Sequence, residues 1–372
     1  MNNTKKTILI LTAQFGAGHI SAANAIKEYI LEEQPSYKVV IQNFISASVP
    51  KMNKPLVKLY EANTKYTPGL YNYYYYLKKS FDSRHDIAYK MYTPKLSQYI
   101  METNPDLIIS TFPMACTCVD YFKTKNPEFK VPTITVVTDV VDSLEWIYPT
   151  TNMYFVASHE IKNRYVQKGI NPNIVKVTGV PVKKEFEHNS KQNSSQKHKL
   201  LIVGGGRGLF DMEDDFFYYI DDLLDLNGDA LEVTIVCGKN QKLYDKLTEK
   251  KPLKNINVLG FVTNMPCLLK EHTLLITKPG GATLFEAIKS EIPVVVMLPK
   301  VGQEIENARF IIDKGIGIVY NDEDDLKNLL DALVDKRLND RINFMVDNII
   351  NFKNSIDYNK IASFVTQLIG TL

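Results

Sequence analysis

The feature that most constrains the fold is an alternation of short, apolar, β-rich runs with longer helical patterns, found on both sides of one polar segment. The strands expected before that segment are residues 7–12, 38–42, 107–110, 133–138, 153–157 and 174–177. Those expected after it are residues 200–203, 232–236, 256–259, 274–277 and 294–298. Such alternation with apolar strands predicts an α/β protein built on parallel, doubly wound sheets.

The polar segment, residues 187–199, reads EHNSKQNSSQKHK and contains no aliphatic residue, which is typical of a linker. The chain has 372 residues, and at about 100–200 residues per domain this favours two domains. We therefore expect Rossmann-like domains at 1–186 and 200–345, and C-terminal helices at 346–372 that pack back toward the N-terminal domain. Because ligands of such sheets bind at the carboxyl ends of the strands, both domains should face a cleft with their strand-to-helix loops.

Charge and cysteine content narrow the class of protein. The net charge is only +2, from 44 basic and 42 acidic residues, so no global preference for nucleic acid is expected. The apolar run 8–11 is too short for a signal-peptide core, and no stretch reaches the roughly 18 apolar residues of a spanning helix. Four Cys without a CxxC pattern indicate reduced thiols in a cytoplasmic protein.

A glycine loop follows the first expected strand. Gly16 and Gly18 allow a tight turn and a close approach of another molecule to the backbone. His19 stands where the next helix begins, so the helix dipole should lower its pKa and leave a neutral imidazole that can accept a proton. The alternative is a histidine that only caps or packs the turn.

Two further glycine loops lie in the second half. Gly205 and Gly206 belong to a run, 204–208, with four glycines in five residues, which indicates a turn that binds an anion or another ligand. Gly280 and Gly281 open a helix, where exposed amides suit a diphosphate. Glu286 falls one turn later, within reach of a ribose diol; the alternative is an ordinary first-turn Glu stabilised by the dipole.

A fourth loop, at 299–307, carries polar side chains that suit sugar hydroxyls, although a helix start with solvated acids would look the same. These side chains are Gln303, Glu304 and Asn307. The acidic run 211–215 is similar to a DxD metal motif, but an acidic helix start accounts for it better, so no metal is expected.

Taken together, these loops resemble glycosyltransferase family 28, and in particular its branch of monogalactosyldiacylglycerol synthases and processive diacylglycerol glucosyltransferases. The resemblance runs from residue 8 to about residue 320, in the expected order. The matching segments are ILILTAQFGAGHISAANAI, TVVTDVVDSLEWIYP, MYFVASHEIKNRYVQKGI, KVTGVPVKKEF, VCGKN, VLGFVTNMPCLL, ITKPGGATLFEAI and GQEIEN.

The resemblance implies a GT-B fold with the acceptor site in the N-terminal domain and a UDP-sugar in the C-terminal domain. It implies an inverting transfer of a hexose to diacylglycerol or a related membrane lipid, with no cofactor beyond the donor substrate. His19 matches the family's base, and Asp139 and Trp146 match a segment beside the acceptor. The positions matching the donor site are Phe261 and Val262 at the uracil, Gly280, Gly281, Thr283 and Glu286 in the donor motif with Glu286 on the ribose, and Gln303, Glu304 and Asn307 at the sugar.

The sequence departs from the family on the acceptor side. Many members carry a His two residues after the Trp, where this chain has Tyr148. In addition, Ala13, Gln14 and Phe15 replace smaller residues before the GxGH motif. These changes bear on the identity of the acceptor rather than on the class of donor.

The window 48–100 is the most biased part of the chain, with nine Lys or Arg, three Asp or Glu, and ten tyrosines. Basic residues attract anionic headgroups and tyrosine prefers the headgroup boundary. We expect the window to bring the protein to an anionic membrane, as a peripheral protein on the inner face of the cell membrane. The alternative is a Tyr-rich helical pair packed on the N-terminal domain.

Three other functions remain open from the sequence. The peptidoglycan branch of the same family would add N-acetylglucosamine to a polyprenyl-linked precursor, and the GAGH loop fits it equally well. A non-catalytic protein on the same scaffold would only bind a nucleotide sugar or a lipid. A UDP-sugar epimerase of similar architecture would release free hexosamine without any lipid.

Overall fold

The structure is a computed structural model that describes residues 5–14, 18–49, 55, 88–187, 197–206, 208, 210, 212–299 and 302–370. Contacts divide the chain into two compact units, which are described separately below. One unit comprises Met1–Lys183, Lys300–Gln303 and Ile356–Leu372, and the other comprises Lys184–Pro299 and Glu304–Ser355. Gly16 and most of the Tyr-rich window 48–100 lie outside the described residues.

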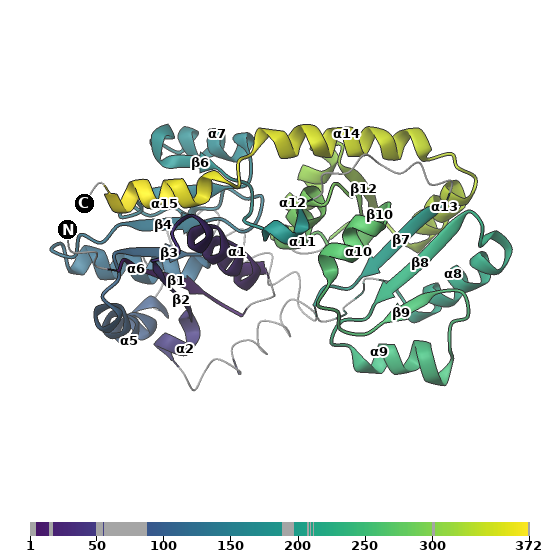
Figure 1. Cartoon of the computed structure of the whole chain (residues 1–372), viewed down its shortest axis with the longest axis horizontal. Coiled ribbons are helices and arrows are strands. Elements are labelled where there is room, and N and C mark those ends of the chain that lie inside the picture. The colour runs from purple at the N-terminus through teal and green to yellow at the C-terminus, as the bar shows by residue number, and fades with distance from the viewer. Residues whose placement is uncertain are drawn as a thin grey trace. The chain divides into compact units, whose positions relative to one another are not determined.

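The first unit is built on a six-stranded parallel sheet with the order β2-β1-β3-β4-β5-β6 (Figure 1). Its strands are β1 (Thr7–Thr12), β2 (Lys38–Asn43), β3 (Leu107–Ser110), β4 (Thr133–Val136), β5 (Met153–Val156) and β6 (Val175–Val177). Its helices are α1 (Gly18–Glu33), α2 (Phe44–Ser48), α5 (Ala88–Thr103), α6 (Pro113–Lys125), α7 (His159–Gln167) and α15 (Lys360–Gly370), with short 3-10 turns η3 (Leu144–Trp146) and η4 (Pro172–Ile174).

Helices cover both faces of this sheet. Side chains of a strand point alternately to its two faces, and Leu9 and Leu11 of β1 pack into a buried cluster with α2, α5 and α6. Ile8 and Ile10 are equally buried and face the other side, where α1 contacts β1 and α15. The continuous apolar pattern of the strands follows from this burial on both faces.

The second unit carries another parallel sheet, with the order β12-β11-β10-β7-β8-β9. Its strands are β7 (His198–Val203), β8 (Leu231–Val236), β9 (Asn257–Leu259), β10 (Leu274–Thr277), β11 (Val294–Met297) and β12 (Gly317–Tyr320). Its helical elements are η5 (Lys184–Phe186), α8 (Asp214–Asn227), α9 (Gln241–Asp245), the π-helical turn η6 (Lys246–Lys250), α10 (Met265–Glu271), α11 (Gly281–Lys289), α12 (Gly302–Lys314), α13 (Glu323–Val334) and α14 (Asn339–Ser355).

Two parallel, doubly wound sheets confirm the predicted fold class. The acidic run at 211–215 does lead into a helix, α8. No helix among the described residues is both long and apolar enough to span a membrane.

One ion cluster fixes the start of the segment predicted as a linker. Lys353 Nζ lies 2.8 Å from Glu187 Oε1 and 2.7 Å from Glu291 Oε1. Lys289, which is only 1% exposed, lies 3.6 Å from the other carboxylate oxygen of Glu187. Side chains of α11 and α14 therefore hold the segment just before residue 188 on the second unit.

Candidate active site

His19 lies in the first turn of α1, and the surrounding residues follow the ends of two other strands. Its Nδ1 atom is 2.9 Å from the hydroxyl of Thr138, just beyond β4. The Thr111 hydroxyl, just beyond β3, donates to the His19 carbonyl at 3.2 Å. Because β1, β3 and β4 are parallel, their carboxyl ends meet at one edge, and this edge holds the histidine.

The environment of the His19 ring keeps it neutral. Burial lowers the pKa of His19 to about 4, against a smaller opposing effect of the Thr111 backbone. The rings of Phe112 and Trp146 stand 5.2 Å and 6.5 Å from the imidazole. Since a neutral imidazole has one nitrogen free to accept a proton, and His19 keeps part of its surface exposed, this residue is suited to act as a base.

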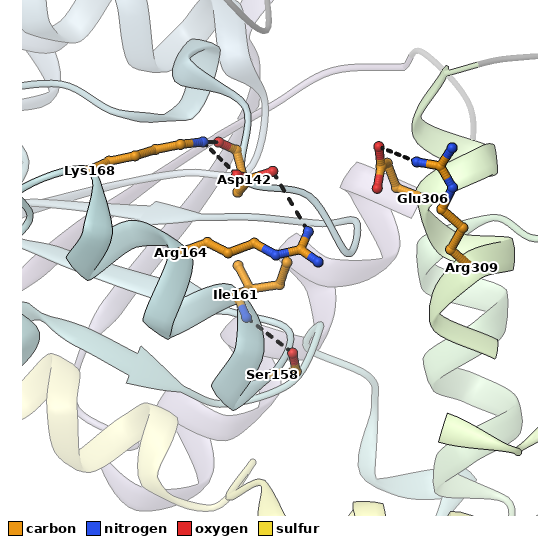
Figure 2. A network of polar contacts seen from close by, with 7 residues as sticks. All are labelled: Asp142, Ser158, Ile161, Arg164, Lys168, Glu306 and Arg309. Carbon is orange, nitrogen blue, oxygen red and sulfur yellow. Dashed lines mark hydrogen bonds and ion pairs between the residues drawn. The ribbon is translucent and has the colours of Figure 1, made fainter. Parts of the chain in front are cut away.

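The loop after β4 carries both predicted acceptor-side residues and is tied to α7. Asp139 is half-buried and Trp146 is buried in η3. Between them, Asp142 accepts hydrogen bonds from Lys168 Nζ through its backbone carbonyl and through a carboxylate oxygen, and Arg164 Nη1 approaches its other carboxylate oxygen at 3.9 Å (Figure 2). Arg164 of α7 and Lys168 at the C-cap of that helix therefore restrain this loop.

Tyr148, which stands where many relatives have a histidine, belongs to the core. It is 3% exposed, its hydroxyl is hydrogen-bonded to Thr117, and its backbone carbonyl accepts a bond from Tyr154. A residue held in this way stabilises the loop and offers no free polar group to a ligand.

The second candidate site lies at the carboxyl edge of the other sheet, where two loops are locked together. The Asn240 amide donates to the Gly208 carbonyl at 2.9 Å, and the Lys239 backbone N–H donates to the Gly206 carbonyl at 3.3 Å. Gly205 and Gly206 nevertheless have open space on their outer side, because a Cβ added to either would meet nothing within 4 Å. Another molecule can approach the backbone here.

The donor motif forms the start of α11. Gly280 is the N-cap and Gly281 the first residue of the helix, and a Cβ added to Gly280 would also meet nothing within 4 Å. Thr283 and Glu286 lie half-buried in the first two turns. The Gly280 N–H donates to the Lys278 carbonyl at 2.8 Å, so the amides that begin at Gly281 are the ones left to an anion. First-turn amides lack intrahelical partners, and with the positive end of the helix dipole they make this an anion-binding position.

Asn307 has a different place from the one predicted. It is fully buried and donates a hydrogen bond to the Pro279 carbonyl at 2.8 Å. It therefore supports the loop before α11 from the second turn of α12. Gln303 and Glu304 lie in the first turn of that helix, and in its second turn Glu306 pairs with Arg309 at 3.3 Å (Figure 2).

Phe261 lies after β9 and is 59% exposed. The ammonium of Lys239 stands 5.5 Å from its ring, and Val262 beside it is half-buried. An exposed ring at the carboxyl edge of a parallel sheet suits stacking against a planar base.

Three residues that contact His19 are not singled out by the sequence pattern. They are Thr138, Thr111 and Phe112, and each lies at or just beyond the carboxyl end of an expected strand. Asn240 caps α9 and holds the Gly208 loop. Position after a strand was the available signal, and it does not say which loops touch.

Two parallel, doubly wound sheets, each with candidate site residues at its carboxyl edge, define a protein of the GT-B fold class. MurG from Acinetobacter baumannii superposes with a TM-score of 0.63 over 99% of this chain and 100% of its own, at 15% identity. CalG4, the calicheamicin glycosyltransferase, superposes with a TM-score of 0.62 over 99% of both chains, at 12% identity. At these identities the likeness shows the fold alone.

The family follows from sequence. Residues 19–182 match the model described as "Monogalactosyldiacylglycerol (MGDG) synthase", and residues 199–357 match "Glycosyltransferase family 28 C-terminal domain". The chain is 31% identical to the processive diacylglycerol beta-glucosyltransferase of Bacillus subtilis (strain 168), over 89% of this chain and 88% of the relative. It is 32% identical to that of Staphylococcus aureus (strain MRSA252), over 90% and 86%. The chain belongs to glycosyltransferase family 28, in the branch of monogalactosyldiacylglycerol synthases and processive diacylglycerol glucosyltransferases.

Proposed function

We propose that this protein transfers a hexose from a UDP-sugar to the hydroxyl of diacylglycerol or a related membrane lipid, with inversion at the anomeric carbon. The observation that carries the proposal is the neutral, partly accessible His19 at the carboxyl edge of the first sheet. Relatives at 31–32% identity are diacylglycerol glucosyltransferases, which favours this function over N-acetylglucosaminyl transfer to a polyprenyl precursor.

The reaction needs one base and one site for the leaving group. The acceptor oxygen forms a bond to the anomeric carbon while its proton passes to Nε2 of His19. The bond between that carbon and the UDP oxygen breaks on the opposite side, which inverts the configuration. The proton transfer accompanies formation of the new bond, because the hydroxyl becomes acidic only as that bond forms.

The second unit would hold the donor. Amides of the first turn of α11, beginning at Gly281, would bind the diphosphate, and with the helix dipole they would stabilise the charge that UDP acquires on leaving. Glu286 would bind the ribose, Phe261 and Val262 the uracil, and Gln303 and Glu304 the sugar. These groups would do what a divalent cation does in other folds, so the proposed reaction uses no metal and no cofactor.

The test is incubation of the purified protein with radiolabelled UDP-glucose, UDP-galactose or UDP-N-acetylglucosamine and vesicles of mixed lipids, followed by separation of the lipid products. We expect a labelled glycosyl-diacylglycerol that is absent with His19→Gln. Label on a polyprenyl lipid, free hexosamine, or UDP binding without any transfer would each replace the proposal with one of the alternatives.

Access to the acceptor requires a membrane surface, and we propose that the basic, Tyr-rich window 48–100 supplies the attraction on the inner face of the cell membrane. The support is its composition and the lipid substrate of the relatives. Wild-type protein should float with phosphatidylglycerol vesicles more than with neutral ones, and added salt should reduce the difference. The triple variant Lys78→Gln, Lys79→Gln and Arg84→Gln, at positions outside the described residues, should bind anionic vesicles less. Equal binding of the wild type to both vesicles at low salt would contradict this proposal.

A further inference from the structure

The hydrogen bond between His19 and Thr138 bears on which nitrogen of the imidazole can act as the base in the proposed reaction. Nδ1 of the imidazole is 2.9 Å from Oγ1 of Thr138, and Thr138 itself is only 2% exposed. A hydroxyl can either donate or accept. The direction of this one bond therefore decides which ring nitrogen carries the proton.

Only one direction makes His19 a base. If Oγ1 donated its hydrogen to Nδ1, the ring proton would be on Nε2, and neither ring nitrogen would have a lone pair available for another proton. If Nδ1–H donates to Oγ1, the lone pair of Nε2 is free. We propose that Thr138 is a positioning residue that accepts the Nδ1–H bond and thereby keeps Nε2 of His19 ready to take the acceptor proton. The inference rests on the proposed role of His19 as the base.

Packing holds the ring but cannot select the proton position. Phe112 meets the imidazole edge-on, at an interplanar angle of 76°, and the Trp146 ring is tilted against it at 44°. The Thr111 hydroxyl fixes only the backbone of His19. Among the residues that the structure describes, the side chain recorded within hydrogen-bond distance of an imidazole nitrogen is that of Thr138, and its hydroxyl can distinguish the two tautomers.

A hydroxyl differs from the carboxylate that often orients a catalytic histidine. A carboxylate stabilises the imidazolium, whereas a neutral hydroxyl leaves the ring uncharged. The carboxylates on the same loop are Asp139, Asp142 and Glu145. Among the described residues none of them contributes to the shift of the His19 pKa, which follows from burial and the Thr111 backbone. Replacing the hydroxyl with a carboxylate should therefore change the titration of His19.

The kinetic test compares three substitutions of Thr138 with a matched control. Thr138→Val keeps the shape and removes the hydroxyl, and kcat should fall about 10–100-fold with an unchanged KM for the UDP-sugar. Thr138→Ser should restore most of kcat. In Thr138→Asp the acid limb of kcat/KM should move up by about 1–3 pH units. Thr135→Val is the control, because Thr135 is an equally buried threonine of β4 that pairs with Thr151.

The direct test observes the ring in the wild-type protein, so it does not depend on the folding of any Thr138 variant. Two-bond ¹H–¹⁵N spectra of histidine-labelled protein, with His19 assigned from His19→Gln, should show the proton on Nδ1. A proton on Nε2, or full kcat in folded Thr138→Val, would overturn the inference while leaving a His19-dependent activity intact. Full activity of His19→Gln would instead overturn the proposed base, and the inference with it.

Discussion

The side-chain amide of Asn240 donates a hydrogen bond to the backbone carbonyl of Gly208 at 2.9 Å. The two residues belong to loops that follow β7 and β8, so this bond joins neighbouring parts of the proposed donor site. Gly208 adopts a positive φ of 62°, and a Cβ there would lie 1.7 Å from the Cys237 carbonyl oxygen. The contact between the two loops therefore requires glycine at this position.

Gly208→Ala should destabilise the second unit by about 2–6 kcal/mol, since backbone strain and steric overlap add. Gly206→Ala is the matched control: its Cβ meets nothing within 4 Å, so its effect should stay within about 0.5 kcal/mol. Chemical denaturation followed by circular dichroism measures both. Equal stabilities of the two variants would show that the loops are not locked in this way.

Gly280→Ala should weaken UDP binding by about 1–3 kcal/mol, because the added methyl group would occupy space that the diphosphate needs. The fold should lose less than about 1 kcal/mol, the difference between Gly and Ala at an N-cap. Calorimetric titration with UDP checks the affinity. Gly370→Ala, at an equally open position at the end of α15, serves as the control and should bind UDP normally.

Glu286→Gln should weaken UDP binding by about 1.5–3 kcal/mol, the usual effect of losing a hydrogen bond to a charged group. Titrations with UDP and with uracil separate the contribution of the ribose from that of the base. Only the affinity for UDP should decrease in the variant. Unchanged affinity for UDP would leave Glu286 as an ordinary charge near the start of a helix.

The low pKa of His19 predicts a loss of stability in acid. An unfolded histidine has a pKa of about 6.5, whereas burial lowers the pKa of native His19 to about 4. As pH falls through this range the unfolded chain binds the proton first, so the free energy of unfolding decreases, by at most about 1.4 kcal/mol per pH unit. Thermal unfolding at pH 7, 6, 5 and 4 should show a smaller acid shift in His19→Gln than in the wild type. Parallel curves for the two proteins would show that His19 does not titrate as expected.

Lys353→Met should destabilise the second unit by about 1–3 kcal/mol, less than for a fully buried pair because Glu187 is 41% exposed. Burial alone would lower the pKa of Lys353, but Glu187 and Glu291 together raise it, so the pair persists throughout the neutral range. Lys360→Met is the control, since Lys360 and Asp357 are 61% and 42% exposed, and it should cost below about 1 kcal/mol. Thermal unfolding compares them.

The fold was predictable from the sequence because buried parallel strands leave a strong apolar signal, as in β1 at Thr7–Thr12. The predicted ends of elements were wrong where backbone hydrogen bonds, rather than side-chain polarity, determine where a strand or helix begins. β7 begins at His198 instead of residue 200, because His198 and Lys199 pair through the backbone with Leu231 and Glu232 despite their polar side chains. Lys239 lies outside α9, which begins at Gln241, and its backbone N–H is bonded to the Gly206 loop.

The candidate site was predictable one loop at a time. His19 and Gly280 could be found because each lies in a glycine loop that follows an expected strand. A sequence does not show which strand ends are neighbours. Thr138 lies 119 residues from His19 along the chain, and Asn307 lies 28 residues from Pro279. Such contacts arise only when parallel strands bring their carboxyl ends to one edge. The roles assigned to the donor-site residues stay predictions.

The buried amide of Asn307 has a consequence for engineering. Because the Asn307 amide is bonded to the Pro279 carbonyl, the start of α11 and the second turn of α12 are expected to move together. Consider a chimera that takes only the segment 279–286 from a relative with another sugar preference. Its new loop would have to pack on an α12 whose sequence belongs to the original loop. Transplanting 279–286 together with α12 keeps Asn307 and the loop that it supports from the same protein. We therefore expect donor preference to be exchanged when both segments are transplanted, and not when either is transplanted alone.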